Sequence, residues 1–345
     1  MDADQLKTTL LGFGGAIAVL AVLLYLVGVG DLVSTLSRAN LDLVAVVVAV
    51  TVAWLAAWSL ALRTVLAVLG VDLSASKAFL VFSGAMFNNN VTPFGQAGGE
   101  PVTALLISRT ADAEYETGLA AIASVDTLNF VPSITLALIG AGYYATEVTF
   151  SRDLRIATGA VVALAVVVPL AVYYGWKNRY SLEHRVVDTL TPAIRWVAGF
   201  VPGVSAPDAG GVERRIGRFF QAIERVATNP RGLALALGLS ALGWLFQMVG
   251  LWLAFQALEI NVPLSVMMFI VPMGAIAGIT PLPGGAGGIE SVLVVLLVAA
   301  PLPTVTESVA LAAVIIYRGA VYWVPVVIGG TVMSVVGVGG VGRAR

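Results

Sequence analysis

Two short stretches decide the fold: TPFGQAGGEP at residues 92–101 and TPLPGGAGGIE at residues 280–290. Each interrupts an apolar region near its middle, residues 78–108 and residues 263–300. The apolar limbs on either side are mostly shorter than the roughly 20 residues that a helix needs to cross a bilayer. Each region is therefore expected to form a re-entrant hairpin or one broken helix, which is tolerated at membrane depth only inside protein or beside a wet cavity.

The rest of the chain has the composition of a membrane protein. Hydrophobic residues make up 59% of its 345 residues and charged residues 11%, whereas a typical soluble domain carries about 25% charged residues. Six further apolar stretches are long enough to span a bilayer, near residues 10–30, 43–62, 117–141, 156–175, 232–257 and 307–338. The first is too long for a signal-peptide core and no A-x-A site follows it, so it is expected to be retained. The sequence predicts an all-α polytopic membrane protein with about six full spans and two Gly/Pro-broken re-entrant hairpins.

The distribution of Lys and Arg predicts the orientation. With the amino terminus in the cytoplasm and both broken regions folded as hairpins, 15 of the 19 basic residues lie inside. Only Arg38, Arg152 and Arg155 lie outside, and Arg318 lies within the last apolar stretch. We therefore expect a multi-pass protein of the cell membrane with both termini cytoplasmic.

The two broken stretches share the order Thr-Pro, Ala-Gly-Gly, Glu, which favours an inverted-topology repeat over two independent kinks. In transporters such a repeat places the substrate site at its interface. The expected organisation is one membrane domain, residues 1–345, with repeat halves at about 43–175 and 232–338 and a cytoplasmic amphipathic connector at 176–231. Within the connector, a helix over residues 212–227 carries four arginines and an apolar face. It is a candidate for contact with anionic lipid, with a purely structural link as the alternative.

The broken segments offer an anion site. A half-helix beginning at Pro101 and another near Ile289 would each present unpaired backbone N–H groups and a positive dipole end, which bind phosphate readily. The glycines beside these ends are Gly98, Gly99, Gly287 and Gly288. They either let a phosphate oxygen approach the backbone or serve only tight turns and close packing.

Glu100 and Glu290 stand at the starts of the same half-helices. A carboxylate there caps the helix, but a charge near the bilayer centre costs about 2.5–3.5 kcal/mol and usually marks a pathway, a relay or an ion pair. Either glutamate is thus also a candidate for binding a cation or a proton. The amides of Asn88, Asn89, Asn90, Gln96 and Asn129 are candidate partners for a headgroup or for freed backbone groups.

Arg318 lies about ten residues into the last apolar stretch, and Tyr322 and Trp323 follow it. An arginine there must snorkel, pair with a carboxylate or face a wet cavity. Glu290 is the nearest intramembrane carboxylate in sequence and a plausible partner. In a functional interpretation, Arg318 supplies a bidentate donor for a substrate phosphate.

Several classes of function are disfavoured by what the sequence lacks. The formal net charge of −1 gives no reason to expect nucleic acid. Cysteine is absent, His184 is the only histidine, and neither H-E-x-x-H nor a Walker lysine pattern occurs. We expect no catalytic residues, no metal and no cofactor, and therefore no enzyme.

Three segments carry a resemblance to a known family: FNNNVTPFGQAGGEPVTALLISR at 87–109, TPLPGGAGGIESVLVVLL at 280–297 and YRGAVYWVPVVIGG at 317–330. The chain resembles the lysylphosphatidylglycerol synthase transmembrane-region, or flippase-like, family over essentially its whole length. The resemblance implies a relative of the lipid-translocating half of aminoacyl-phosphatidylglycerol synthases and of proposed archaeal flippases for polyisoprenoid-linked sugars. The longest polar stretch has no room for a soluble aminoacyl-transferring domain. Thr103 stands where many relatives carry arginine, and Asp126 is kept without the Glu-Arg pair often seen nearby.

The expected function is to bind and translocate a phospholipid or a polyisoprenyl-phosphate-linked sugar. A small-solute or ion secondary transporter is the alternative, as is a membrane-embedded transferase with Glu100 or Asp126 as its base. The expected substrate-binding residues are Asn89, Asn90, Thr92, Gln96, Gly98, Gly99, Glu100, Asp126, Thr280, Gly284, Gly285, Gly287, Gly288, Glu290 and Arg318.

Overall fold

The computed structural model describes residues 3–92, 96–147, 152–198, 209–279, 282–300 and 302–341. Within these ranges every regular element is helical, with thirteen α-helices and two short 3₁₀ turns. Five helices are long and apolar enough to cross a membrane: α3 (Leu41–Val68), α6 (Tyr115–Glu147), α7 (Arg152–Lys177), α10 (Pro230–Ala257) and α13 (Glu307–Val341). A sixth span results if α1 (Ala3–Val27) and α2 (Val29–Leu36), which are bent by 89°, count as one. The all-α polytopic fold is thus confirmed.

Local capping signals set the beginnings of the central helices. The Asn40 side chain accepts the backbone N–H groups of Asp42 and Leu43 at the start of α3. Asn229 does the same for the N–H of Gly232, with Pro230 in the first turn of α10. Side-chain oxygens at this position satisfy donors that the helix leaves unpaired, and proline loses nothing there.

Both interrupted regions fold back on themselves as pairs of short helices. The first consists of α4 (Ala75–Val91) and α5 (Gln96–Ala111), and the second of α11 (Leu264–Ile276) and α12 (Gly288–Ala299) with the 3₁₀ turns η1 (Ala277–Ile279) and η2 (Pro283–Gly285) between them. In each region the two limbs pack on one another. The limbs are shorter than a full span, which agrees with the expected hairpins. The face of the membrane on which each hairpin opens stays a prediction.

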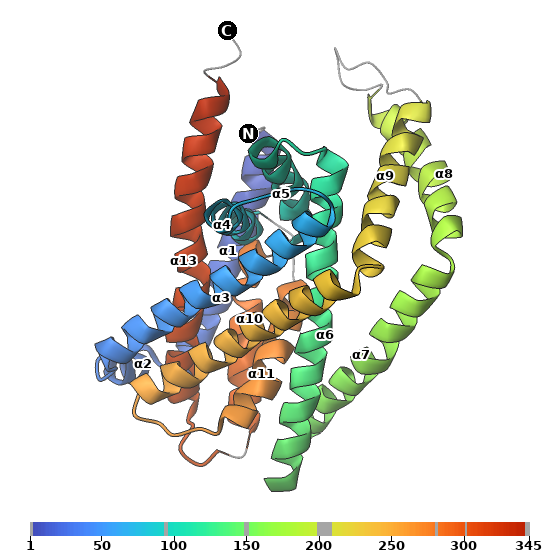
Figure 1. Cartoon of the computed structure of the whole chain (residues 1–345). Coiled ribbons are helices and arrows are strands. Elements are labelled where there is room, and N and C mark those ends of the chain that lie inside the picture. The colour runs from blue at the N-terminus through green and yellow to red at the C-terminus, as the bar shows by residue number, and fades with distance from the viewer. Residues whose placement is uncertain are drawn as a thin grey trace.

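Helices α3 and α10 lie side by side across the middle of the molecule and run in opposite directions (Figure 1). The Asn40 N–H at the start of α3 donates to the Ala257 carbonyl at the end of α10, at 2.8 Å. At the crossing, Trp54, Trp58 and Trp244 meet edge to face, and the Trp58 indole donates to the Ser240 carbonyl at 3.1 Å. This antiparallel pair is the axis about which the two hairpins are arranged.

Each hairpin packs against the helix that follows the other hairpin. Helix α4 packs on α13, and α11 packs on α6. Exchanging α3, α4, α5 and α6 for α10, α11, α12 and α13 turns every close pairing among these eight helices into another close pairing. The packing therefore has the two-fold form that an inverted repeat predicts, and it brings the broken ends of both hairpins to the interior.

The connector, residues 176–231, packs against this core through α9 (Ala209–Ala227). Val212, Ala222 and Val226 of α9 are buried, and α9 packs on α6 and on α8 (Arg179–Ala198). Two ion pairs fasten α9 to the start of α6: Arg215 with Glu116 at 3.4 Å and Arg218 with Glu114 at 2.5 Å. The apolar face that suggested a membrane-surface helix is thus used for packing, while the anionic-lipid contact itself stays a prediction.

Candidate functional site

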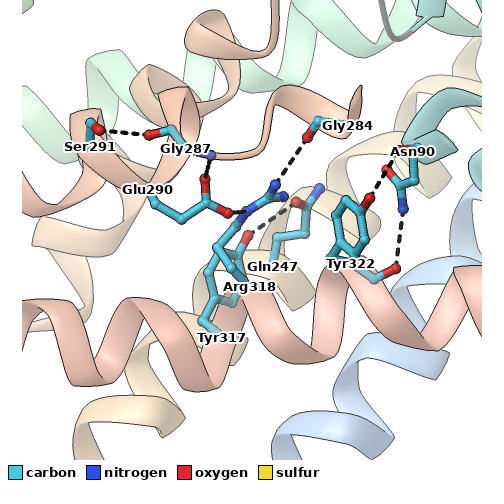
Figure 2. A network of polar contacts seen from close by, with 9 residues as sticks. All are labelled: Asn90, Gln247, Gly284, Gly287, Glu290, Ser291, Tyr317, Arg318 and Tyr322. Carbon is cyan, nitrogen blue, oxygen red and sulfur yellow. Dashed lines mark hydrogen bonds and ion pairs between the residues drawn. The ribbon is translucent and has the colours of Figure 1, made fainter. Parts of the chain in front are cut away.

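The second hairpin and α13 are joined by a buried ion pair (Figure 2). The Nε atom of Arg318 donates to Glu290 Oε1 at 2.8 Å, and its Nη2 donates to the Gly284 carbonyl at 3.0 Å. Arg318 is 8% exposed and Glu290 7%. Of the three possibilities for an arginine in an apolar stretch, the structure shows pairing with a carboxylate, and the partner is the glutamate that sequence proximity suggested.

Glu290 also caps its own helix. Its second oxygen, Oε2, accepts the Gly287 N–H at 2.6 Å, at the start of α12. The capping interpretation and the pairing interpretation therefore both hold, one for each carboxylate oxygen. The carboxylate therefore satisfies a backbone donor at a helix amino terminus, where anions are stabilised.

Glycines shape the turn that brings these groups together. Gly284, Gly285 and Gly287 have φ values of 58°, 65° and 84°, a region that other residues adopt only with strain. A Cβ on Gly284 would lie 2.7 Å from the Tyr322 ring, and one on Gly287 would lie 2.8 Å from Val19. Turn conformation and close packing both require glycine here, and the Gly284 turn is what presents its carbonyl to Arg318.

Helix α4 of the first half reaches the same site through Asn90. The Asn90 amide donates to the Tyr322 carbonyl at 3.2 Å, and the Tyr322 hydroxyl donates to the Asn90 carbonyl at 3.0 Å. Beside Arg318, the Tyr317 hydroxyl donates to Gln247 Oε1 at 3.2 Å. Sequence reasoning missed Tyr317, Tyr322 and Gln247 as site residues. Their polar atoms within apolar spans, two of them flanking Arg318, were the signal that pointed to them.

A second cluster lies at the first hairpin. Helix α5 begins at Gln96 and not at Pro101 as expected, so Pro101 lies inside the helix and Glu100 is its fifth residue. Glu100 forms a side-chain hydrogen bond with Asp126 of α6. The Asp126 Oδ2 atom is buried and has no hydrogen-bond partner. The Asn89 side chain contacts Gly99 so closely that a Cβ on Gly99 would collide with it. This cluster contains two acids and, among the residues described, no base in contact with them.

The expected site residues divide between these clusters. Asn90, Gly284, Gly285, Gly287, Gly288, Glu290 and Arg318 belong to the second hairpin and its neighbours, and Asn89, Gly99, Glu100 and Asp126 to the first. Thr92 lies at the end of α4, where its hydroxyl donates to the Asn88 carbonyl at 2.6 Å. Thr280 lies outside the described residues, as do the side chain of Gln96 and the surroundings of Gly98. Among the residues described, no group of three or more His, Asp or Glu residues could hold a metal ion.

Comparison with known proteins places this site in a wider context. Residues 10–329 match the family described as "Lysylphosphatidylglycerol synthase TM region". Two proteins of Methanothermobacter thermautotrophicus, each named "UPF0104 membrane protein", are 24% and 26% identical; the alignments cover 94% and 89% of this chain and 92% and 89% of theirs. A UPF0104 membrane protein of Pyrococcus horikoshii is 23% identical over 91% of this chain and 93% of its own. The similarity extends over both hairpins and all the spans between them.

Proposed function

Because this chain belongs to the lysylphosphatidylglycerol synthase transmembrane-region family, a family of membrane proteins, we propose that it binds a phospholipid or a polyisoprenyl-phosphate-linked sugar and moves it across the bilayer. The proposal is transport without covalent chemistry. It includes a location in the cell membrane with both termini cytoplasmic, because that orientation leaves most of the basic residues inside.

The observation that carries the proposal is the buried Arg318 guanidinium beside a glycine turn and a helix amino terminus. A planar guanidinium with a fixed fork of donors is the protein group best suited to a phosphate. In the structure the Arg318 guanidinium is paired with the Glu290 carboxylate. A substrate phosphate would take its place on Arg318 and would keep the buried arginine neutralised throughout the exchange.

The energetics favour an exchange over a simple opening. Breaking a buried ion pair with nothing in its place costs about 3–5 kcal/mol, since one charge is left without compensation. A phosphate that arrives as Glu290 leaves removes most of that cost. An anionic headgroup is therefore able to open the site, whereas a neutral solute is not.

The lipid tail has a route beside the same hairpin. Val295 of α12 is 56% exposed and Ile276 of α11 is 37% exposed, and α7 is buried along only 11% of its apolar window. Apolar surface of this kind in a membrane protein faces hydrocarbon. These exposed faces support a substrate whose headgroup enters while its tail stays in lipid. On α9, the exposed Arg214 and Arg225 are the groups we assign to contact with anionic headgroups.

Reconstitution of the purified chain in liposomes tests the function. Labelled phospholipids and polyisoprenyl-phosphate sugars are placed in one leaflet and their transbilayer movement is followed, with empty liposomes as the baseline. We expect acceleration for at least one phosphate-bearing lipid and a loss of it in Arg318→Ala. A matched control is Arg109→Ala, which removes an exposed arginine at the end of α5. If no lipid moves faster while a soluble solute is taken up, the lipid interpretation is wrong.

A further inference from the structure

Corresponding positions in the two halves carry different chemistry. Asp126 lies eleven residues after Tyr115, the first residue of α6, and Arg318 lies eleven residues after Glu307, the first residue of α13. Glu100 and Glu290 both lie near the start of the second limb of their hairpins. The same packing therefore brings a glutamate to an arginine in one half and to an aspartate in the other.

Two carboxyl groups at hydrogen-bond distance must share a proton. An ionised carboxylate only accepts hydrogen bonds, so a bond between two of them requires an O–H on one side. Like charges this close do not both ionise. Asp126 lies about 16 Å along α6 from its first residue, well inside a helix that is long and apolar enough to span the membrane. Acidic groups at such depth typically act in proton relays or ion pathways.

Unpartnered atoms beside the pair provide a second, independent observation. On α4, which packs on α5, Asn88 is 6% exposed and its buried Nδ2 donor has no acceptor. The adjoining residue, Asn89, has a buried Oδ1 without a donor, and its side chain contacts Gly99, next to Glu100. With Asp126 Oδ2, two buried acceptors beside Glu100 lack a donor, one on each of the two helices, α4 and α6, that pack against α5. Buried polar groups are normally satisfied, and two acceptors without a donor beside two acids are surroundings that suit a bound proton.

Other charged groups are engaged elsewhere or lie at helix ends. On α9, Arg215 and Arg218 pair with Glu116 and Glu114, and on α3 the Arg63 side chain donates to the Leu73 carbonyl. The remaining charges on α3 to α7 and α10 lie in terminal turns: Asp42, Lys77, Arg109, Glu147, Arg152, Asp153, Arg155, Lys177 and Arg231. Helix α11 carries no charged residue. In the part of the chain that the structure describes, no basic side chain contacts either acid, and no group of three or more His, Asp or Glu residues could hold a metal ion.

We propose that Glu100 and Asp126 form a proton-binding site that couples transport to a proton gradient. When the proton leaves, the carboxyl O–H bond breaks, the proton passes to water, and two adjacent carboxylates remain. Their repulsion separates the start of α5 from α6. Uptake of a proton from water on the other side restores the hydrogen bond and closes the contact. The coupling rests on the proposed function, whereas the bound proton does not.

Infrared spectroscopy of the purified full chain tests the proton without any transport. A step to higher pH should remove a protonated-carboxyl band from the wild-type spectrum. The band should be absent in Glu100→Gln and in Asp126→Asn and present in Glu290→Gln, because that carboxylate is held by Arg318. Asp126→Glu keeps a carboxyl group at the site and should therefore show the band at a shifted frequency. This variant is the control for misfolding of the other two. No band in wild type, or a band that survives both substitutions, would overturn the proposal.

Liposomes with an imposed pH gradient test the coupling. The ratio of lipid movement with the gradient to movement without it should exceed one in wild type and fall to about one in Asp126→Asn. A ratio that responds to a sodium gradient instead would refute proton coupling. If the infrared band is present and lipids do not move at all, the proton site stands and the proposed function falls.

Discussion

The two hairpins are built alike and differ in how well their polar groups are satisfied. In the second, both Glu290 oxygens are bonded, one to Arg318 and one to the Gly287 N–H. In the first, Glu100 meets another acid, and Asp126 Oδ2 and the Asn88 amide have no partner. A satisfied buried pair is held in place, whereas an unsatisfied one is free to change its protonation or its partner. The comparison indicates that the shared packing places Glu100 and Glu290 at corresponding positions. The residue that each one meets on the following helix, Asp126 or Arg318, then decides whether it shares a proton or forms an ion pair.

The largest effect should come from breaking the satisfied pair. Arg318→Ala leaves Glu290 buried and uncompensated, which should lower the free energy of unfolding by about 3–5 kcal/mol. Asp126→Ala should cost less, about 1–3 kcal/mol, because it removes a hydrogen bond from Glu100 but leaves no ion without its counter-charge. Thermal unfolding in detergent would measure both. The double variant Arg318→Ala with Glu290→Ala should cost less than the sum of the single changes. Equal losses in the two hairpins, or strict additivity of the double variant, would contradict the comparison.

The two hairpins should also differ in how much stability they lose when a glycine is replaced. Gly287→Ala forces a residue into positive φ and against Val19, which should cost about 1–3 kcal/mol. Gly99→Ala meets the side chain of Asn89, which can turn away, and comes within 3.1 Å of the Asn89 backbone N. Gly99 does not have a positive φ, so the cost should be about 1 kcal/mol. Gly319 in α13 has nothing within 4 Å of an added Cβ, and Gly319→Ala serves as the control. A Gly287 variant as stable as the Gly319 variant would show that the turn is not strained.

Arg318→Lys tests geometry at constant charge. Lysine keeps Glu290 neutralised, so expression and insertion should be retained. It lacks the planar fork of donors, so lipid movement should fall by about tenfold or more, the effect of losing a charge-assisted hydrogen bond worth about 1.5–3 kcal/mol. The measurement is the initial rate in liposomes, with Arg109→Lys as the matched control. Full activity in Arg318→Lys would refute the bidentate role of Arg318. A positive charge alone would then be enough at this position.

Sequence patterns predicted the spans and the breaks but few of the side-chain partners. Hydropathy found the long helices because bilayer thickness fixes their length, and Gly and Pro marked both hairpins. The Glu290–Arg318 pair was foreseeable because a buried arginine needs an anion. The hydrogen bonds between Asn90 and Tyr322 join residues 232 positions apart. Helix periodicity carries no information over such a separation in sequence. The pattern of α9 suggested contact with anionic lipid or a purely structural link. The helix packs on α6 and the lipid contact stays a prediction, since an amphipathic pattern does not name its partner.

The smallest perturbation tests the opposed orientation on which the whole comparison depends. Single cysteines in place of Lys77, Arg109, Glu259 and Thr304 all lie at exposed positions of a chain without cysteine, so each should change stability by less than about 0.5 kcal/mol. Gly232 at the start of α10 packs on Val68 at the end of α3, and Asn40 bonds to Ala257 at the other end of that helix pair. The end of α3 at Val68 and the start of α10 at Gly232 should therefore lie on the same face of the membrane. The loop before Lys77 should lie on that face as well. A membrane-impermeant thiol reagent applied to intact cells should label the Glu259 and Thr304 positions, and should reach the Lys77 and Arg109 positions only after lysis. Labelling of the Lys77 and Arg109 positions from opposite faces would show that α4 and α5 cross the membrane in one piece, and the two halves would no longer be inverted copies.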